Sequence, residues 1–573
     1  MMKKLLLLLA IAHVNAKAQQ LTVFEESKGK RSATYLQTID FYNALDKKYS
    51  TIKMQEAGAT DVLYPLHVVL CNNRSNFNID EWKNSGNIVI LINNGIHPGE
   101  PDGIDASMML LRDIASGKVK LPDNVMLAVV PVFNIGGALN RNSTSRTNQN
   151  GPEEYGFRGN AQNLDLNRDF IKLDAKETQS LVQLFHRLDP DLFIDNHVSN
   201  GADYQHLMTL LATQHNKLGG SMGTYLNKQL EPAIYADMKK RGYDLVPYVN
   251  HWGHTPDKGW IAFHEGPRFA SGFAALFQTY GFVPETHMLK PFKDRVEATY
   301  ALMQSLINTA SENATQIKAT RKQDREAIQK ENAFTLEWAV DTTQPSTIEF
   351  KGYEAGYKPS GVSGQPRLYY DRSKPYSKQV PFYNTYVAKS EVPAPRAYVI
   401  PQGWGRVIER LKMNDVQMQP LQRDSVMEVQ VYTITNYETG KRPYEGHYQH
   451  SNVQAANEMK KVRMMRGDYI IPMDQKAKRY LIETLEPTAP DAFFAWGFFD
   501  AILQQKEYFS DYVFEDEAGE MLKKDPVLAA RLKQRCAADT AFANDAEAQL
   551  EFVYRCSPHY EAGHMRYPVF RVN

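Results

Sequence analysis

Two residues with the chemistry of metal ligands, His97 and Glu100, stand three positions apart just after a predicted strand, Asn87 to Asn93. Open α/β sheets place their sites at the carboxyl ends of strands, so this pair is expected where ligands bind. An imidazole and a carboxylate at this spacing can reach one cation. His-x-x-acid pairs also begin at His186 and His254, as chance predicts, but neither follows a strand and a turn. The context therefore selects His97 and Glu100.

A polar loop farther along the chain, Arg158 to Asp169, brings guanidinium and amide groups close together. Arg158 and Arg168 carry planar cations, which suit bidentate recognition of carboxylates, and Asn167 adds an amide. Taken by itself, a stretch of this composition is more often a solvated surface loop. The loop is a candidate for binding an anionic group only in company with other signals.

Two further candidates end short apolar runs. His197 closes the predicted strand Asp191 to Val198, where a lone histidine is more often structural than bound to metal. Glu285 ends the run that begins at Gly281, and an ordinary glutamate at a helix entry is the alternative interpretation. A carboxylate in a partly dry cleft can serve as the general base that a metal-activated water requires. These weak signals gain weight from their fixed order in the chain.

Taken in order, these residues resemble the zinc carboxypeptidase family related to carboxypeptidase A. That family has a His-x-x-Glu pair, an Arg, an Asp-x-Asn-Arg stretch, a distant His and finally a Glu. The nine-residue step from Arg158 to Asn167 is similar to that of bacterial and cytosolic-type members, and the chain is identified as an exported bacterial member. Over roughly residues 60 to 310, the matching elements are His97 and Glu100, Arg158, Asp165 to Arg168, His197 and Glu285.

The resemblance implies one Zn²⁺ ion held by His97, Glu100 and His197, with a further coordination position left open for water. It also implies that Asp165 orients His97 and fixes its tautomer. Arg158 would face the scissile carbonyl oxygen, where negative charge grows as the tetrahedral intermediate forms. These residues would make up the metal centre and its immediate support.

By the same resemblance, Asn167 and Arg168 bind the free carboxylate at the end of the substrate, which restricts such an enzyme to terminal residues. Glu285 takes a proton from the water on the zinc and later passes it to the leaving amine. The expected function is an exported zinc metallocarboxypeptidase. Its expected partners are the C-termini of peptides or proteins.

One loop departs from the family pattern and leaves the oxyanion residue open. Where the family often has Asn-Pro-Asp-Gly, this chain has Asn134-Ile-Gly-Gly, which puts the shape of that loop in doubt. Arg141 and Arg146 compete with Arg158 for the position that faces the substrate carbonyl.

Polar and aromatic residues between the third ligand and the catalytic glutamate leave other assignments open. Many family members use a tyrosine there, and Tyr248 and Tyr280 are both available. The stretch that follows His251 is a candidate lining for the pocket that takes the substrate side chain. His251, His254 and Glu265 also form an alternative metal set.

The segment from about 60 to 290 alternates short β-branched apolar runs with longer stretches of helical period. This alternation predicts an α/β fold with a mixed, mostly parallel central sheet and helices on both faces. The predicted strands are Asn87 to Asn93, Val125 to Phe133, Asp191 to Val198, Leu207 to Ala212 and Phe282 to Pro284. The predicted helices are Gly103 to Ser116, Asp174 to Leu188, Gly220 to Arg241 and a long closing helix, Lys293 to Lys330.

Residues 336 to 573 form a predicted C-terminal accessory region, β-rich from about 340 to 435 and mainly helical from about 470 to 573. No motif identifies its role, which could be to assist folding, to cover the pocket or to bind partners or polysaccharide. His447 and His450 are expected to be surface histidines. The predicted elements are strands at Ala397 to Ile400 and Met427 to Val431, and helices at Gly405 to Met413, Lys476 to Leu485, Phe493 to Lys506 and Glu517 to Arg531.

Residues 1 to 18 are typical of a secretory signal peptide, with Lys3 and Lys4, an apolar run and a small-x-small pattern at Ala16 to Ala18. The zinc peptidase domain is then predicted to span residues 19 to 335, and the protein to be periplasmic or extracellular. No later segment reaches about 18 uninterrupted apolar residues, so no stable membrane insertion is expected after cleavage. Lys plus Arg equals Asp plus Glu, 66 against 66, which excludes whole-chain attraction to nucleic acid.

Three cysteines are too few for a disulfide framework or a thiolate zinc site. Cys536 and Cys556 could pair in an exported protein, and Cys71 is expected to be a free, buried thiol.

Two other functions use the same residues. The first is an amidase or peptidase of cell-wall peptides, which also carry terminal carboxylates. The second is a non-catalytic protein that binds peptide ends, but the presence of Glu285 argues against it, because a binding protein needs no general base.

Overall fold

A computed structural model describes residues 20 to 573 of the chain. The predicted signal peptide, residues 1 to 18, lies outside the described residues. Among residues 20 to 573, no helix combines the length and the apolar character needed to cross a membrane.

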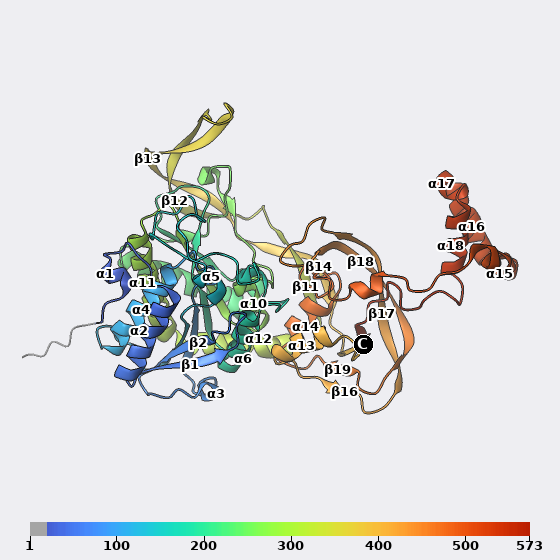
Figure 1. Cartoon of the computed structure of the whole chain (residues 1–573), viewed down its shortest axis with the longest axis horizontal. Helices are drawn as coiled ribbons and strands as arrows, with labels where there is room; N and C mark the ends of the chain where they lie inside the picture. Colours follow the sequence, from blue (N-terminus) through green and yellow to red (C-terminus); the bar gives the residue numbers. More distant parts are fainter. Residues whose placement is uncertain (1–19) are drawn as a thin grey trace, which may run out of the picture.

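A nine-stranded sheet forms the centre of the N-terminal half (Figure 1). Its strand order is β1-β2-β4-β3-β5-β10-β7-β8, with β6 also paired to β10. The pairs of β3 with β4 and β5, and of β10 with β5 and β6, are parallel, whereas β1, β2 and β7 pair antiparallel with β2, β4 and β10. The strands are β1 (Ile52–Gly58), β2 (Leu66–Cys71), β3 (Ile88–Asn93), β4 (Val125–Val130), β5 (Leu192–Asp195), β6 (His197–Ser199), β7 (Met208–Ala212), β8 (Val246–Pro247) and β10 (Tyr280–His287).

Helices cover both faces of this sheet, because successive side chains of its strands point to opposite sides. In β3, Val89 and Leu91 belong to one hydrophobic cluster, whereas Ile88, Ile90 and Ile92 belong to another. This arrangement confirms the predicted α/β class. The first cluster includes α6 (Lys176–Leu188) and α10 (Ala270–Leu276), and the second includes α2 (Tyr35–Lys48), α4 (Asp102–Ala115), α9 (Glu231–Lys240) and α11 (Phe292–Glu312).

The predicted closing helix, Lys293 to Lys330, is wrong as a single element. The chain forms α11 and then α12 (Ala314–Lys330), which meet at Asn313. The Asn313 side chain donates to the carbonyl of Thr309 at 2.8 Å and accepts from the hydroxyl of Tyr225 at 2.9 Å. An asparagine that bonds locally in this way competes with helix continuation, which explains the break.

The remaining elements of this half are short. They are α1 (Val23–Glu26), α3 (Ile79–Trp82), α5 (Ile135–Leu139), α7 (His215–Leu218), α8 (Gly220–Tyr225) and β9 (Trp260–Ile261). A π-helical turn, Leu226–Leu230, joins α8 to α9, so the predicted helix Gly220 to Arg241 is one continuous segment with a distorted middle.

The C-terminal region holds a six-stranded sheet, a long projecting hairpin and an outlying group of helices (Figure 1). The sheet order is β16-β19-β15-β20-β17-β18. Its strands are β15 (Ala397–Ile400), β16 (Gln419–Pro420), β17 (Ser425–Thr439), β18 (His450–Met464), β19 (Tyr469–Pro472) and β20 (Phe570–Val572). The hairpin is β12 (Ser346–Pro359) with β13 (Pro366–Tyr383), and β11 (Ala333–Val340) pairs with β14 (Tyr386–Pro393).

Of the four helices predicted in this region, two are confirmed and two are wrong. α13 (Gly405–Met413) and α14 (Lys478–Leu485) are confirmed. The predicted helix Glu517 to Arg531 is wrong, because Asp525 and Pro526 end α15 (Asp511–Lys524) and start α16 (Pro526–Ala538). Two further helices follow, α17 (Thr540–Ala543) and α18 (Ala546–Arg555).

The predicted helix Phe493 to Lys506 is also wrong. Most of it is a series of turns, with a single 3₁₀ turn at Asp500–Leu503. Phe493, Phe494 and Trp496 are fully buried there, and Gly497 has a φ of +72°, which a helix does not permit. Burial of aromatic rings has overridden local helix propensity.

The cysteines are all free thiols. Cys536 and Cys556 do not pair, so the disulfide that the sequence left possible is not formed. Cys71 is buried as expected, and burial raises its pKa to about 12.

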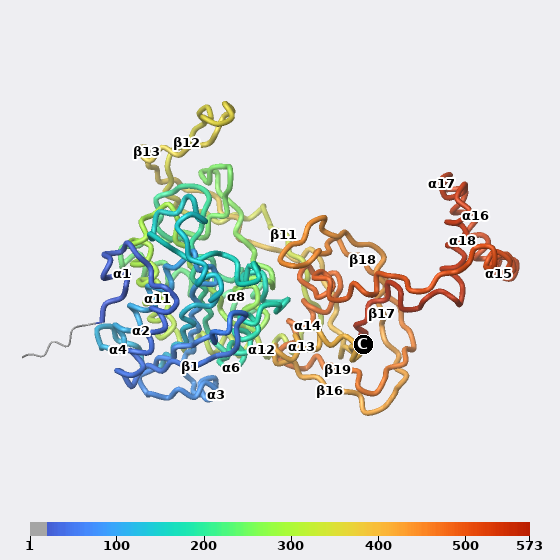
Figure 2. The backbone as a smooth tube through the Cα atoms, viewed as in Figure 1, coloured from blue at the N-terminus to red at the C-terminus, as the bar shows by residue number. Residues whose placement is uncertain are grey.

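The C-terminal region shares a hydrophobic core with the first half of the chain. Figure 2 shows its backbone beside α6 and α12, and one buried cluster runs from Leu66 on β2 to Val569 near the C-terminus. Across this junction Phe277 stacks on Tyr480, with ring centroids 5.5 Å apart. The predicted domain boundary near residue 335 stays a prediction, and this core crosses it.

Replacing Phe277 by alanine should lower the free energy of unfolding by about 3 to 5 kcal/mol, because it opens a cavity in the shared core. Urea denaturation followed by fluorescence measures this change. Tyr512→Ala is the control, since the Tyr512 side chain is 84% exposed, and should alter stability by less than about 0.5 kcal/mol. An unchanged midpoint for Phe277→Ala would contradict the shared core.

Candidate metal centre

The candidate ligands emerge at the carboxyl ends of neighbouring parallel strands. After β3 the chain turns at Gly95, whose φ is +68°, and forms the His97 to Glu100 turn, closed by a 2.8 Å backbone hydrogen bond. Asp195, the last residue of the neighbouring strand β5, pairs with Asn93 of β3. Strand register thus brings sequence-distant side chains to one edge of the sheet.

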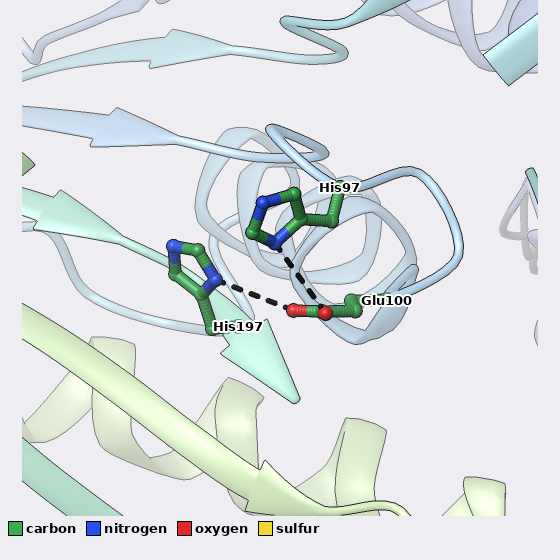
Figure 3. Close-up of side chains that lie close together, drawn as sticks. All are labelled: His97, Glu100 and His197. Atoms are coloured by element: carbon green, nitrogen blue, oxygen red, sulfur yellow. Dashed lines mark ion pairs between the residues drawn. The ribbon is translucent and has the colours of Figure 1, made fainter. Parts of the chain in front are cut away.

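Three side chains converge there, as Figure 3 shows. The Nδ1 atom of His97 lies 3.4 Å from Oε1 of Glu100, and Nδ1 of His197 lies 3.3 Å from Oε2 of the same carboxylate. All three residues are buried, and one ligand atom from each falls within 4.8 Å of the others. Ligands of a tetrahedral zinc at about 2.1 Å lie roughly 3.4 Å apart, so this donor set fits a zinc ion.

Two aspartates fix which nitrogen each histidine presents. Nε2 of His97 lies 2.8 Å from Asp165, and Nε2 of His197 lies 2.9 Å from Asp195. Asp195 is held in turn by the side-chain amide of Asn93 at 2.9 Å. Each Nε2–H therefore donates to a carboxylate and leaves Nδ1 as an acceptor. The buried Nδ1 of His97 has no hydrogen-bond partner among the described residues, as a metal-ligating atom would not.

The electrostatic surroundings keep two of these carboxylates charged. Burial by itself raises the pKa of Glu100, but Arg146 and His97 outweigh it and hold that pKa well below its usual value. Burial opposes ionisation of Asp165 too, and there His97 and Arg158 prevail and lower the pKa. The centre thus offers a cation full negative charge.

Glu285 lies beside this group, since its backbone pairs in register with His197 across β10 and β6. Burial raises the pKa of the Glu285 carboxyl to about 8, with His197 opposing the rise and Glu100 adding to it. Its Oε2 atom is buried and has no hydrogen-bond partner among residues 20 to 573. A cation at the centre would favour the charged carboxylate.

Two arginines flank Glu100, and they are engaged to different degrees. Arg146 donates from Nη1 to Glu100 at 2.8 Å, and its other two nitrogens bond Gln149 and the carbonyl of Val198. Arg158 bonds Asp165 through Nε and Nη2, and its Nη1 lies 3.6 Å from Glu100.

The third arginine that the sequence left open, Arg141, lies apart from the site. It bonds the backbone carbonyls of Ser32, Ala33 and Glu154. It is absent from the lining of the cavity that holds the candidate ligands.

The 3₁₀ turn Leu166–Arg168 presents Asn167 and Arg168 to the same cavity. Asp165 caps this turn, accepting from the backbone N–H of Asn167 at 2.9 Å. Arg168 lies over the Phe269 ring at 4.3 Å, and its Nη1 donates to the carbonyl of Asn167. Its Nη2 makes no hydrogen bond to any residue from 20 to 573.

A cavity of about 520 Å³ joins these groups. This volume is within the range of sites for small ligands. Leu211, Tyr248, Phe263 and Phe269 supply apolar and aromatic walls, and Glu265 adds a further buried carboxylate. The other lining residues include His97, Glu100, Arg146, Arg158, Asn167, Arg168, His197, Trp252 and Glu285.

The two tyrosines and the two metal sets that the sequence left open differ in where they lie. Tyr248 lines the cavity, whereas the hydroxyl of Tyr280 bonds Thr320. Within residues 20 to 573, His97, Glu100 and His197 are the one group of three or more potential ligands close enough to share an ion. Glu265 instead bonds the Ser271 hydroxyl at 2.5 Å, so the alternative set is not assembled.

The expectation that His447 and His450 lie on the surface is wrong. His450 is only 4% exposed and lies 2.9 Å from Asp500, and His447 lies 2.7 Å from Asp174. Both are structural contacts of the C-terminal region, because each imidazole packs against aromatic rings as well.

Sequence reasoning missed three supporting residues. Asp195 precedes His197 by two positions and bonds its ring, a spacing that could have been noticed. From the C-terminal region, Tyr444 contacts Arg168, which is 276 positions away in the chain, and Glu445 contacts Asp165. No local signal marks such a distant pair.

Part of the chain is similar to one family of known proteins. Residues 38 to 187 match the family described as zinc carboxypeptidase. The chain is similar to carboxypeptidase 2 of Trichophyton equinum, 23% identical over 439 residues, and of Trichophyton rubrum, 23% identical over 449 residues. Both alignments cover 73% of this chain and 75% of the relative.

Solved structures with segments similar to this chain include two carboxypeptidases, both at low TM-scores. A metallo-carboxypeptidase from Burkholderia cenocepacia has a TM-score of 0.37 and 14% identity, and covers 49% of this chain and 70% of its own. Carboxypeptidase A from Helicoverpa armigera has a TM-score of 0.38 and 13% identity, and covers 50% of this chain and 75% of its own.

An α/β fold with three side chains that could hold a metal ion, beside a buried carboxylate, is the arrangement that a metal-dependent hydrolase needs. The match of residues 38 to 187 to the zinc carboxypeptidase family and the similarity to the fungal carboxypeptidases support a zinc-dependent peptidase. This family uses one zinc ion, and the group of His97, Glu100 and His197 can hold it.

Replacing Asp195 by asparagine should weaken zinc binding about 10- to 100-fold, because the His197 ring loses its charged partner. Competition with a fluorescent zinc chelator measures the affinity. Asp123→Asn, at an exposed position, is the matched control and should leave affinity unchanged. Equal affinities for both variants would show that Asp195 does not support the metal centre.

Proposed function

We propose that the protein is an exported metallocarboxypeptidase that removes C-terminal residues from peptides, with Glu285 as general base. The observation that carries this proposal is that His97, Glu100 and His197 converge in one cavity with Glu285 and the unpartnered Nη2 atom of Arg168. Metal ligands, a base and an anion-binding group are the parts that such a reaction needs.

Zinc would be held by Nδ1 of His97, Nδ1 of His197 and the carboxylate of Glu100. When bound, it supplies Lewis-acid chemistry that polarises a carbonyl and lowers the pKa of water. Asp165 and Asp195 keep both imidazoles in the tautomer that such binding requires.

Glu285 would remove the proton from the attacking water as the new carbon–oxygen bond forms. It would then deliver that proton to the amine as the carbon–nitrogen bond breaks. Its burial, together with its unpartnered Oε2, supports this role, since a dry carboxylate exchanges protons readily near neutral pH.

Arg158 would face the substrate carbonyl oxygen. Its side chain is 45% exposed and its Nη1 has only a 3.6 Å contact with Glu100, so a donor remains for a developing negative charge. Arg146 is the weaker candidate, because protein groups already engage all three of its nitrogens.

Asn167 and Arg168 would bind the terminal carboxylate of the substrate. Nη2 of Arg168 has no protein hydrogen-bond partner among the described residues, so it can donate a charge-assisted hydrogen bond to a carboxylate. Export rests on the sequence of residues 1 to 18, which has the pattern of a cleavable signal.

The same site fits a second substrate, the stem peptide of a bacterial cell wall, which also ends in a carboxylate. A third function is non-catalytic binding of peptide ends. Such a protein needs no general base, so the presence of Glu285 argues against this function. These alternatives are outcomes of the experiments that follow.

The purified mature protein should contain about one zinc ion per chain and should shorten linear peptides by one C-terminal residue. A chelator should abolish cleavage, and added zinc should restore it. Metal analysis together with mass spectrometry of a peptide and muropeptide panel provides the test. Cleavage of muropeptides alone would replace the peptide function by the cell-wall alternative, and tight binding without cleavage would favour a binding protein.

Replacing Glu285 by glutamine should reduce kcat more than about 100-fold while zinc content stays unchanged, because the base is lost and the ligands remain. Glu312→Gln, an exposed helix position, is the matched control and should retain full rate. Full activity of Glu285→Gln would remove this residue from the mechanism.

Replacing His197 by alanine should deplete the bound zinc, because one of the three ligands is removed. Atomic emission of the dialysed protein measures the loss. His254→Ala is the control, since His254 lies outside the assembled group, and should retain its metal. Undiminished zinc in His197→Ala would place the metal elsewhere.

A further inference from the structure

The loop between β17 and β18, residues 440 to 449, lies against the segment that carries Asp165 and Arg168. The Tyr444 hydroxyl accepts a hydrogen bond from Nε of Arg168 at 2.9 Å. A carboxylate oxygen of Glu445 accepts from the backbone N–H of Asp165 at 2.7 Å. The C-terminal region therefore contacts the candidate substrate-binding loop directly, through two adjacent residues.

A tight turn sets the position of these two residues. Tyr444 and His447 exchange backbone hydrogen bonds of 2.7 and 3.1 Å, and the central pair, Glu445 and Gly446, has φ values of +49° and +79°. Positive φ at both central residues is the geometry of a type I′ turn, which usually has asparagine or aspartate before the glycine. A glutamate is unusual at such a position. In this conformation its carboxylate accepts the hydrogen bond from the backbone N–H of Asp165.

The Tyr444 ring rests on a rigid base. It stacks on Trp496, with centroids 6.1 Å apart and planes 16° apart, and Trp496 is fully buried. The guanidinium of Arg268 lies 4.7 Å from the Trp496 ring and 5.9 Å from the Tyr444 ring, and bonds Asp491 at 2.7 Å. These contacts restrict the ring, so the hydroxyl remains at a fixed point beside Arg168.

Arg168 is consequently held on three sides. Tyr444 engages Nε, the carbonyl of Asn167 engages Nη1, and the Phe269 ring covers one face. Nη2 makes no hydrogen bond to a described residue, and Arg168 lines the cavity of the metal centre. An arginine fixed in this way loses less conformational entropy when it binds a carboxylate than a free one does.

We propose that Tyr444 is a positioning residue for substrate recognition: it holds Arg168 in the orientation that binds the free carboxylate of a substrate's last residue. This inference rests on the proposed function of Arg168 within the site. It gives the C-terminal region a definite part in selecting substrates, through a residue that does not itself touch them.

The test compares two forms of one ligand with the zinc-loaded, full mature protein. The ligand is a blocked tripeptide whose last peptide bond is a non-cleavable methyleneamino link, prepared as free acid and as C-terminal amide. Calorimetry gives the dissociation constant of each form. Because both forms meet the metal in the same way, the difference between them isolates recognition of the carboxylate.

Tyr444→Phe keeps the stacked ring and removes the hydroxyl. The free acid should bind roughly three- to tenfold more weakly to this variant, since one hydrogen bond to a charged group is lost, and the amide should bind as before. With cleavable peptides, KM should rise by the same factor while kcat stays within about twofold. Tyr448→Phe is the matched control, because Tyr448 lies in the same loop, is 54% exposed, and should change neither constant.

A double-mutant cycle separates positioning from general support of the fold. In an Arg168→Gln background, Tyr444→Phe should weaken acid binding by less than about twofold, because the partner it acts through is gone. The proposal is overturned if Tyr444→Phe binds the acid as tightly as the unmodified protein, or if its effect persists without Arg168. It is also overturned if the unmodified protein binds acid and amide equally.

Failure of the proposed function gives a different result. A protein that prefers the acid, loses that preference in Tyr444→Phe and yet cleaves no peptide would retain the positioning role and lose the peptidase assignment. Melting temperatures of all variants within a few degrees of the unmodified protein would show that none of these effects comes from unfolding.

Discussion

One carboxylate, that of Asp165, connects the candidate metal centre to the turn that carries Asn167 and Arg168. It accepts from Nε2 of His97, from the backbone of Asn167 and from the guanidinium of Arg158. The first contact turns Nδ1 of His97 toward Glu100, and the others shape the turn that carries the anion-binding groups. Because a single buried group accepts from all three, the His97 ring, the Asn167 turn and the Arg158 guanidinium are positioned together. Its charge is maintained by the cations around it, against the effect of burial.

The sheet supplies the framework that this carboxylate completes. β3, β5 and β10 pair in parallel, so their carboxyl ends lie side by side although long crossovers separate them in the chain. The residues that follow Asn93 and Asp195 therefore lie at the same edge of the sheet as Glu285. Alternating apolar side chains bury both faces, which leaves the edge as the place where polar groups meet. The C-terminal region packs on one of these faces through a core that includes Phe277 and Tyr480.

Local features of the sequence were enough to predict much of this arrangement. The β-branched run before His97 predicted a buried strand, and the resemblance of the ordered polar residues to the zinc carboxypeptidases implied the metal group. What failed depended on tertiary contacts: the aromatic residues from Phe493 are buried individually in turns, and the His447 loop is held by residues far away in the chain. Pairing of Tyr444 with Arg168 spans 276 positions, and neither residue stands in a pattern that indicates the other.

The contact between Glu445 and Asp165 can form only late in the synthesis of the chain. Synthesis runs from the N-terminus, so the candidate metal ligands, Glu285 and Arg168 are all made well before Tyr444 and Glu445. Arg168 and Tyr444 can meet only when most of the polypeptide has been made and the C-terminal region has packed against the first half. A chain that ends before residue 444 therefore lacks both side chains that contact Asp165 and Arg168 from the C-terminal region.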